Sequence, residues 1–186
     1  MRLILASASP RRAALLRDAG FVFEIVSSDV EETPFPGEGA ADYTLRVAGD
    51  KTRHVAELPS SAGAVVLAAD TEVVIGGRIL GKPASPEHAG EMLRELSGTA
   101  HDVLTAVVIR TNGREVSEIV RTRVVFAPIS PEEVRWYVGS GEPMGKAGAY
   151  AIQGLGARFV ERIEGSWSSV VGLPIATVHR LLREVQ

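Results

Sequence analysis

Six consecutive apolar residues, Ala64-Val-Val-Leu-Ala-Ala69, constrain the fold of this chain more than any other segment. A strand with one face in water alternates apolar and polar residues, whereas an unbroken apolar run is typical of a strand covered on both faces. Asp70 follows the run. We expect this charge at the carboxyl edge of the sheet, where ligands of open α/β sheets usually bind. The alternative is a turn aspartate that caps Thr71 or Glu72.

The first twenty residues predict a strand, a short turn and a helix. Residues 3–6 form an apolar run of strand type. Ser9 is a good N-cap, and Pro10 suits the first helical position because its missing N–H has no partner there. Gly20 suits the end of the helix. A helix is therefore expected between Pro10 and Gly20.

Arg11 and Arg12 fall in the first turn of that helix. The positive end of the helix dipole disfavours cations there by about 0.3–1 kcal/mol each. The turn before them contains Ser7 and Ser9, and together with the free N–H groups of a helix N-terminus it forms a site for anions. Two guanidinium groups beside such a site indicate phosphate as the partner. The alternative is that both arginines point into water.

The rest of the chain mixes strand and helix patterns, which predicts an α/β or α+β fold with a mixed sheet. Further strands are expected at residues 21–26, 103–109 and 116–126. Further helices are expected at residues 40–58, 86–97, 131–138 and 174–183. Hairpins are predicted over 73–80 around Gly76-Gly77 and at Asn112-Gly113. The glycine-rich segment 139–156 gives no clear prediction.

Composition excludes several classes of protein. The 186 residues are 45% hydrophobic, enough for one compact domain with a substantial core. A net charge of −3 and only 5% aromatic residues argue against a nucleic-acid partner. The absence of cysteine excludes disulfides and thiolate chemistry, and the four histidines lack metal-ligand spacing. The apolar runs are too short for a signal peptide or a membrane span, so we expect a cytoplasmic protein with no membrane partner.

Further polar side chains are candidates for phosphate chemistry: Glu32, Lys51, Lys82, Lys146 and Gln153. Lys82 lies between a glycine and a proline, which suits a positioned charge, although it could be an ordinary solvated lysine. Lys51 could equally belong to a salt-bridged helix face. Glu32 could hold a metal or be solvated in its loop, and Lys146 could be a solvated residue of a flexible segment. The amide of Gln153 offers a donor and an acceptor, as recognition of a base edge requires.

These cations and carboxylates suit a triphosphate with a divalent cation. The chain contains no Gly-x-x-x-x-Gly-Lys-Ser/Thr loop, no Gly-x-Ser-x-Gly elbow and no Gly-x-Gly-x-x-Gly segment after its first strand. P-loop enzymes, serine hydrolases of the α/β type and dinucleotide-binding proteins are therefore excluded.

Several blocks between residues 3 and 174 resemble the Maf family, in the order that the family has them. They are Leu5–Arg12, Asp70-Thr71, Gly81–Pro83, Leu96–Gly98 with His101–Thr105, Gly145–Gly154 and Val170–Pro174. The resemblance implies a single domain over residues 1–186. It also implies an elongated mixed sheet flanked by helices, with two lobes around a central cleft, similar to the inosine triphosphatases.

The resemblance also implies roles for individual residues. Asp70 resembles the general base that activates water, and with Glu32 it matches a site for Mg²⁺ or Mn²⁺. The positions that match triphosphate contacts are Ser7, Ser9, Arg12, Lys51 and Lys82. The positions that match determinants of substrate choice are Arg11, Thr71 and Gln153. Thr52 and Trp167 depart from the family, which usually has alanine and tyrosine there.

The function that the resemblance implies is hydrolysis of dTTP and UTP to the monophosphate and pyrophosphate. Modified pyrimidine triphosphates are further candidate substrates. The role would be housekeeping of the nucleotide pool, with a link to septum formation, by a homodimer. Two alternatives stay open at this point. One is the same reaction on 7-methyl-GTP or another purine nucleotide, and the other is a non-enzymatic, nucleotide-sensing regulator of division.

Overall fold

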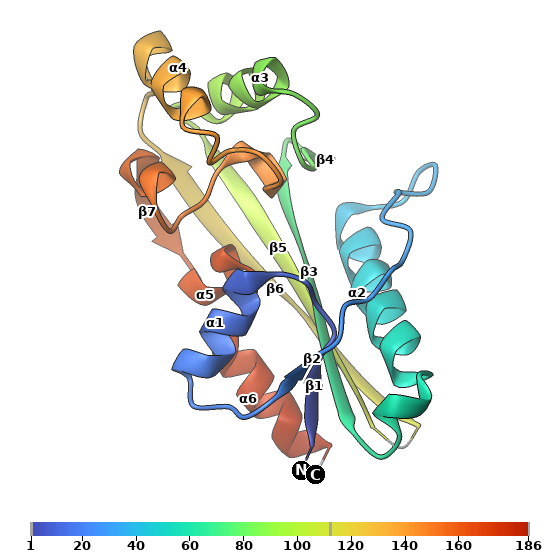
Figure 1. Ribbon diagram of the computed structural model, residues 1–186. Helices are drawn as coiled ribbons and strands as arrows, with labels where there is room; N and C mark the ends of the chain where they lie inside the picture. Colours follow the sequence, from blue (N-terminus) through green and yellow to red (C-terminus); the bar gives the residue numbers. More distant parts are fainter. Residues whose placement is uncertain (1, 112, 186) are drawn as a thin grey trace. The chain divides into compact units, whose positions relative to one another are not determined.

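The computed structural model describes residues 2–111 and 113–185, and these form two compact units (Figure 1). The first unit comprises Met1–Asp70, Thr105–Val120 and Gly172–Gln186. The second comprises Thr71–Leu104 and Arg121–Val171. The prediction of one domain over residues 1–186 includes Met1 and Gln186, which lie outside the described residues. It stays a prediction, as does the cleft between two lobes.

The strands of the described residues form a seven-stranded sheet in the order β2-β1-β3-β5-β6-β7, with β4 paired to β3. The strands are β1 (Leu3–Leu5), β2 (Glu24–Ile25), β3 (Val65–Ile75), β4 (Arg78–Ile79), β5 (Ala100–Thr111), β6 (Arg114–Phe126) and β7 (Val160–Glu164). Strand β1 pairs in parallel with β2 and β3, whereas β3–β4 and β6–β7 are antiparallel. The predicted mixed sheet is confirmed.

The helices lie close to their predicted ranges. They are α1 (Pro10–Asp18), α2 (Ala40–Ala56), α3 (Pro86–Leu96), α4 (Pro131–Gly139), α5 (Trp167–Val171) and α6 (Ile175–Glu184), with 3₁₀ turns η1 (Pro59–Ser61), η2 (Ala147–Ala149) and η3 (Leu155–Phe159). The side chain of Ser9 caps α1 by accepting the Arg12 amide, as predicted. In the described part of the chain, no helix is both long and apolar enough to cross a membrane.

Two predicted segments differ from the structure, and two elements were not predicted. The strand expected at residues 21–26 is only the two-residue β2, whose side chains are exposed. The strand expected to stop before Asp70 continues to Ile75 and leads directly into the predicted hairpin with β4. Strand β7 and helix α5 were not predicted. Of the second predicted hairpin turn, Asn112 lies outside the described residues.

In the first unit, the central strands β1 and β3 are buried on both faces, as the apolar run predicted. Strands β1 and β3 are almost entirely inaccessible to solvent. On one face, alternate residues of β1 and β3, including Ile4 and Val66, pack against Val55 of α2. Figure 1 shows α1 and α6 on the opposite side of the sheet from α2. The face that carries Val66 is therefore the face that meets α2.

The second unit is built around buried aromatic rings. The ring of Phe126 packs edge-on against His101 and Tyr150, at centroid distances of 5.0 and 4.8 Å. His101 Nε2 and Tyr150 Oη are 2.9 Å apart. Burial lowers the pKa of His101 to about 4, which the nearby charge of Asp102 only partly opposes. The imidazole is therefore neutral at physiological pH and belongs to the core.

A backbone contact in the second unit joins the loop of Lys82 to the glycine-rich segment. The Gly148 amide donates to the Gly81 carbonyl at 2.8 Å. Gly148 has φ +67°, and a Cβ there would lie 2.8–2.9 Å from the side chain of Val73. The backbone therefore approaches β3 so closely that only glycine fits.

We expect Gly148→Ala to lower the free energy of unfolding by about 2–4 kcal/mol, the sum of backbone strain and overpacking. Gly145→Ala is the matched control, because Gly145 has φ +72° but open space where its Cβ would lie. It should show the strain alone, about 1 kcal/mol. Urea unfolding followed by circular dichroism measures both. Equal losses in the two variants would contradict the close packing against Val73.

Candidate active site

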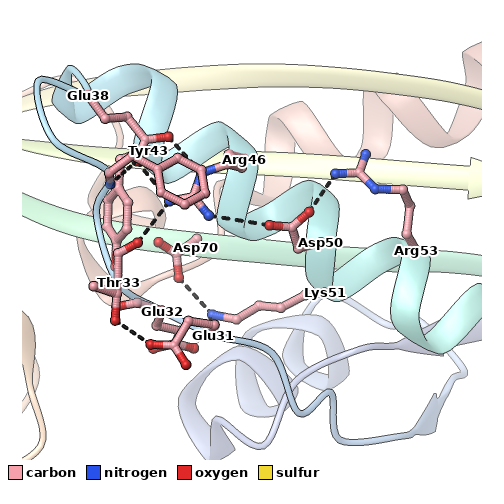
Figure 2. A network of polar contacts seen from close by, with 11 residues as sticks. Glu31, Glu32, Thr33, Glu38, Tyr43, Arg46, Asp50, Lys51, Arg53 and Asp70 are labelled. Carbon is pink, nitrogen blue, oxygen red and sulfur yellow. Dashed lines mark hydrogen bonds and ion pairs between the residues drawn. The ribbon is translucent and has the colours of Figure 1, made fainter.

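A buried ammonium group joins two carboxylates in the first unit (Figure 2). Lys51 Nζ lies 2.8 Å from Asp70 Oδ1 and 2.6 Å from Glu32 Oε1. The side chains of Lys51 and Asp70 are only 9% and 8% exposed, whereas that of Glu32 is 37% exposed. The three groups carry a net charge of −1, and the cluster is open to solvent on the side of Glu32.

Asp70 lies in the middle of β3 and not at its end, so the expectation of a strand-terminal or turn aspartate was wrong. Side chains alternate along a strand, so Asp70 shares the face of Val66 that α2 covers. Its neighbour β1 ends at Leu5, which is paired with Leu67. Strand β1 therefore ends before it reaches the part of β3 that contains Asp70. On the side of β1, Asp70 thus lies beyond the end of the shorter neighbouring strand.

Lys51 does not belong to the salt-bridged face of α2. That face consists of Arg46, Asp50 and Arg53, which pair with one another at 3.4 and 2.7 Å. Successive helical residues are 100° apart, which turns Lys51 from this face toward the sheet. There the buried ammonium of Lys51 contacts the carboxylates of Asp70 and Glu32. Thr52, which departs from the family pattern, donates its hydroxyl to the Ala48 carbonyl at 2.9 Å.

Two residues of α2 hold the loop that carries Glu32, and sequence analysis did not identify them. Tyr43 Oη donates to the Glu32 carbonyl at 2.9 Å, and Arg46 Nη2 donates to the Thr33 carbonyl at 3.0 Å. Arg46 also forms a two-point pair with Glu38, which lowers the pKa of Glu38 to about 2. Figure 2 shows these residues on the same side of the loop as Lys51. Their spacing along α2 gave no signal, since their partners are loop carbonyls.

The N-terminus of α1 forms a second polar cluster in the first unit. Arg12 donates through Nε to the Gly172 carbonyl at 2.8 Å and through Nη1 to Ser7 Oγ at 3.3 Å. The Ser9 amide also donates to Ser7 Oγ, at 3.2 Å. These bonds fix the plane of the guanidinium. Arg11 is half-buried in the same turn, so neither arginine extends freely into water.

The other predicted residues belong to the second unit. Thr71 is half-buried in β3, Lys82 is exposed after β4, and Gln153 is exposed between η2 and η3. The ammonium of Lys146 donates to the carbonyl of Glu142, four residues earlier in the same glycine-rich segment. Within this unit, the Gly148–Gly81 bond brings the segment that leads to Gln153 beside the loop of Lys82.

The donor set of the first unit fits a hard divalent cation. Asp70 Oδ2 is buried, and the described residues supply no hydrogen bond to it. Glu32 adds a second carboxylate, which contacts the same Lys51 Nζ. The described residues contain no cluster of three His, Asp or Glu side chains that could enclose a metal. Two carboxylates suit an ion such as Mg²⁺ that takes its other ligands from water and substrate phosphates.

Comparison with known proteins identifies the family of this chain. The chain is 53% identical to "dTTP/UTP pyrophosphatase" of Anaeromyxobacter dehalogenans, over 98% of this chain and 93% of the relative. It is 50% identical to the protein of the same name from Methylococcus capsulatus, over 100% and 91%. The Ham1 protein of Staphylococcus aureus has a similar fold, with a TM-score of 0.52 over 100% of both chains at 12% identity. A model of the family described as "Maf-like protein" matches residues 2–185. The chain therefore belongs to the Maf family.

Proposed function

We propose that this chain hydrolyses dTTP and UTP between the α and β phosphates and releases the nucleoside monophosphate and pyrophosphate. The observation that carries the proposal is the buried Asp70, with one carboxylate oxygen on Lys51 and the other without a hydrogen bond from the described residues. Relatives at about half identity over nearly the whole chain carry the name of this activity. A nucleotide sensor would have no need of such a base.

In this mechanism, Asp70 orients and deprotonates the attacking water. The Lys51 ion pair holds Oδ1 in place, so Oδ2 is the oxygen that accepts the proton. The ammonium also partly neutralises Glu32 and Asp70, which reduces the repulsion that a triphosphate meets. Glu32 and Asp70 would hold a Mg²⁺ or Mn²⁺ ion, which when bound polarises the phosphate and lowers the pKa of bound water.

Positive groups balance the charge that develops on the leaving pyrophosphate. A triphosphate carries roughly four negative charges, and positioning and electrostatics supply most of the catalysis in such reactions. Arg12, already fixed by Ser7 and Gly172, provides a planar fork for phosphate oxygens. Lys82 is a further cation to which the resemblance assigns a phosphate contact. Arg11, Thr71 and Gln153 select the base. The cytoplasmic location, the homodimer and the link to septum formation stay predictions from the resemblance.

Asp70→Asn should reduce the rate of pyrophosphate release from dTTP by 10²–10⁴-fold, since an amide cannot accept the proton. Binding of a non-hydrolysable dTTP analogue, measured by calorimetry, should persist. Asp50→Asn is the matched control, because this half-buried aspartate pairs with Arg46 and Arg53 on the outer face of α2. A rate above about a tenth of wild type in Asp70→Asn would exclude Asp70 as the base.

Removal of divalent cations with EDTA should abolish turnover, and Mg²⁺ or Mn²⁺ should restore it. Glu32→Gln should raise the Mg²⁺ concentration for half-maximal rate about tenfold or more, because one of two anionic ligands is lost. Glu31→Gln provides the control, since the neighbouring Glu31 side chain bonds to Thr33. Full turnover in EDTA would rule out a metal, and equal effects of the two variants would rule out Glu32 as its ligand.

Gln153→Ala should reduce the preference for dTTP and UTP over dCTP while the rate on dTTP changes less. Thymine and uracil present a carbonyl acceptor where cytosine presents an amino donor, and a single amide can distinguish them. The ratio of kcat/KM values across a panel that includes GTP and 7-methyl-GTP measures this. A ratio equal to that of wild type would contradict the role of Gln153, and a higher rate on 7-methyl-GTP than on dTTP would point to the other branch of the family.

A further inference from the structure

Glu142 binds the turn that follows Gln153. Its Oε1 accepts the Gly156 amide at 2.9 Å, and its Oε2 accepts the Leu155 amide at 3.0 Å. Both amides belong to the start of η3, only two and three residues after Gln153. A half-buried carboxylate that accepts two consecutive backbone amides fixes the orientation of that peptide. The segment after Gln153 is therefore attached, by a charge-assisted bond pair, to the turn that follows α4.

Tyr137, near the end of α4, binds the backbone that precedes Gln153. Its hydroxyl accepts the Ala151 amide at 3.1 Å and donates to Glu142 Oε1 at 2.9 Å. Ala151 lies two residues before Gln153, and Leu155 lies two residues after it. The exposed Gln153 thus projects from a turn that is held at both ends by one connected pair of side chains.

The glycines of the turn confirm how closely it packs. Gly154 has φ +98°, and a Cβ there would lie 2.5 Å from Glu142 Oε2. A Cβ on Gly156 would lie 2.5 Å from the Ala151 carbonyl oxygen and 2.6 Å from Tyr137 Oη. The turn therefore packs against the carboxylate and the hydroxyl so closely that neither glycine position has space for a side chain.

The charge states agree with these donor and acceptor roles. Burial acts to raise the pKa of Glu142, but the amides of Gly156 and Leu155, the hydroxyl of Tyr137 and the charge of Lys146 together lower it below its usual value. Burial raises the pKa of Tyr137, so its hydroxyl keeps its proton and can donate to Glu142. Glu142 is consequently an anion whose acceptor sites are directed at the turn.

We propose that Glu142, with Tyr137, is a specificity-determining positioning residue that fixes where the amide of Gln153 meets the base. This rests on the proposed role of Gln153 in selecting dTTP and UTP. A glutamine side chain is long and adaptable, so it discriminates between base edges only if its backbone is held. Glu142 contributes that restraint without touching the substrate.

The test is Glu142→Gln, which keeps the size of the side chain but replaces one acceptor by an N–H₂ donor facing a backbone amide. The ratio of kcat/KM for dTTP over dCTP should fall about tenfold, the order expected when a charge-assisted hydrogen bond is lost. Glu133→Gln is the matched control. The Glu133 carboxylate also accepts a backbone amide, that of Ser130 at 2.8 Å, but it caps the start of α4 and has no contact with the turn.

A double-mutant cycle separates positioning from general destabilisation. In a Gln153→Ala background, Glu142→Gln should leave the dTTP/dCTP ratio unchanged, because the side chain that it positions is gone. Additive losses of selectivity would overturn the proposal. If Glu142→Gln fails to fold by circular dichroism, Tyr137→Phe replaces it in the same cycle. A dTTP/dCTP ratio equal to that of wild type in the single Tyr137→Phe variant would overturn the proposal.

Amide hydrogen exchange of the wild-type protein gives a readout independent of activity. The Leu155 and Gly156 amides should exchange at least tenfold more slowly than the amide of exposed Gly145, and Glu142→Gln should remove that protection. Lack of protection in wild type would overturn the proposal. If wild type releases no pyrophosphate from dTTP, the proposed function fails. If Gln153→Ala relaxes selectivity and Glu142→Gln does not, only the positioning role fails.

Discussion

The site of the first unit depends on one buried ammonium group. Removing an ion from water costs several kcal/mol, and a buried pair seldom stabilises a protein more than apolar residues of the same size would. Lys51 and Asp70 are therefore poor choices for stability alone. Their arrangement is suited to a task in which a carboxylate must be held in one position beside a positive charge. The position of Glu32 at the solvent side of the same ammonium leaves the cluster accessible to a charged substrate.

Backbone groups are restrained by side chains around both predicted functional loops. In the first unit, Tyr43 and Arg46 of α2 bind carbonyls of the Glu32 loop. In the second, Glu142 and Tyr137 bind amides on both sides of Gln153. In each case side chains of a helix, or of the turn that follows it, hold a loop whose own residues make few regular backbone hydrogen bonds. A functional side chain on a loop is placed precisely only when such bonds replace the backbone hydrogen bonds of a helix or strand.

Sequence patterns predicted the local structure well where contacts between residues close in sequence determine it. Ser9 and Pro10 set the start of α1 through contacts within four residues, and Gly76-Gly77 set the β3–β4 hairpin in the same way. The patterns failed where the outcome depended on distant neighbours. The segment 21–26 has strand composition but only two residues pair with β1. Asp70 ends an apolar run, yet the strand continues, because the ammonium of Lys51 on α2 forms an ion pair with the Asp70 carboxylate.

Residue chemistry and short-range sterics alone specify the charged side chains, the starts of the helices and the burial of the central strand. The sequence also placed the chain close to a known family through six blocks of residues. Tertiary packing was needed to turn Lys51 inward while Arg46 and Asp50 form the outer face of α2. Packing also brings Glu142 to the amides of a turn thirteen and fourteen residues further along the chain. Such pairings arise when helices pack on the sheet, and no periodicity along the chain encodes them.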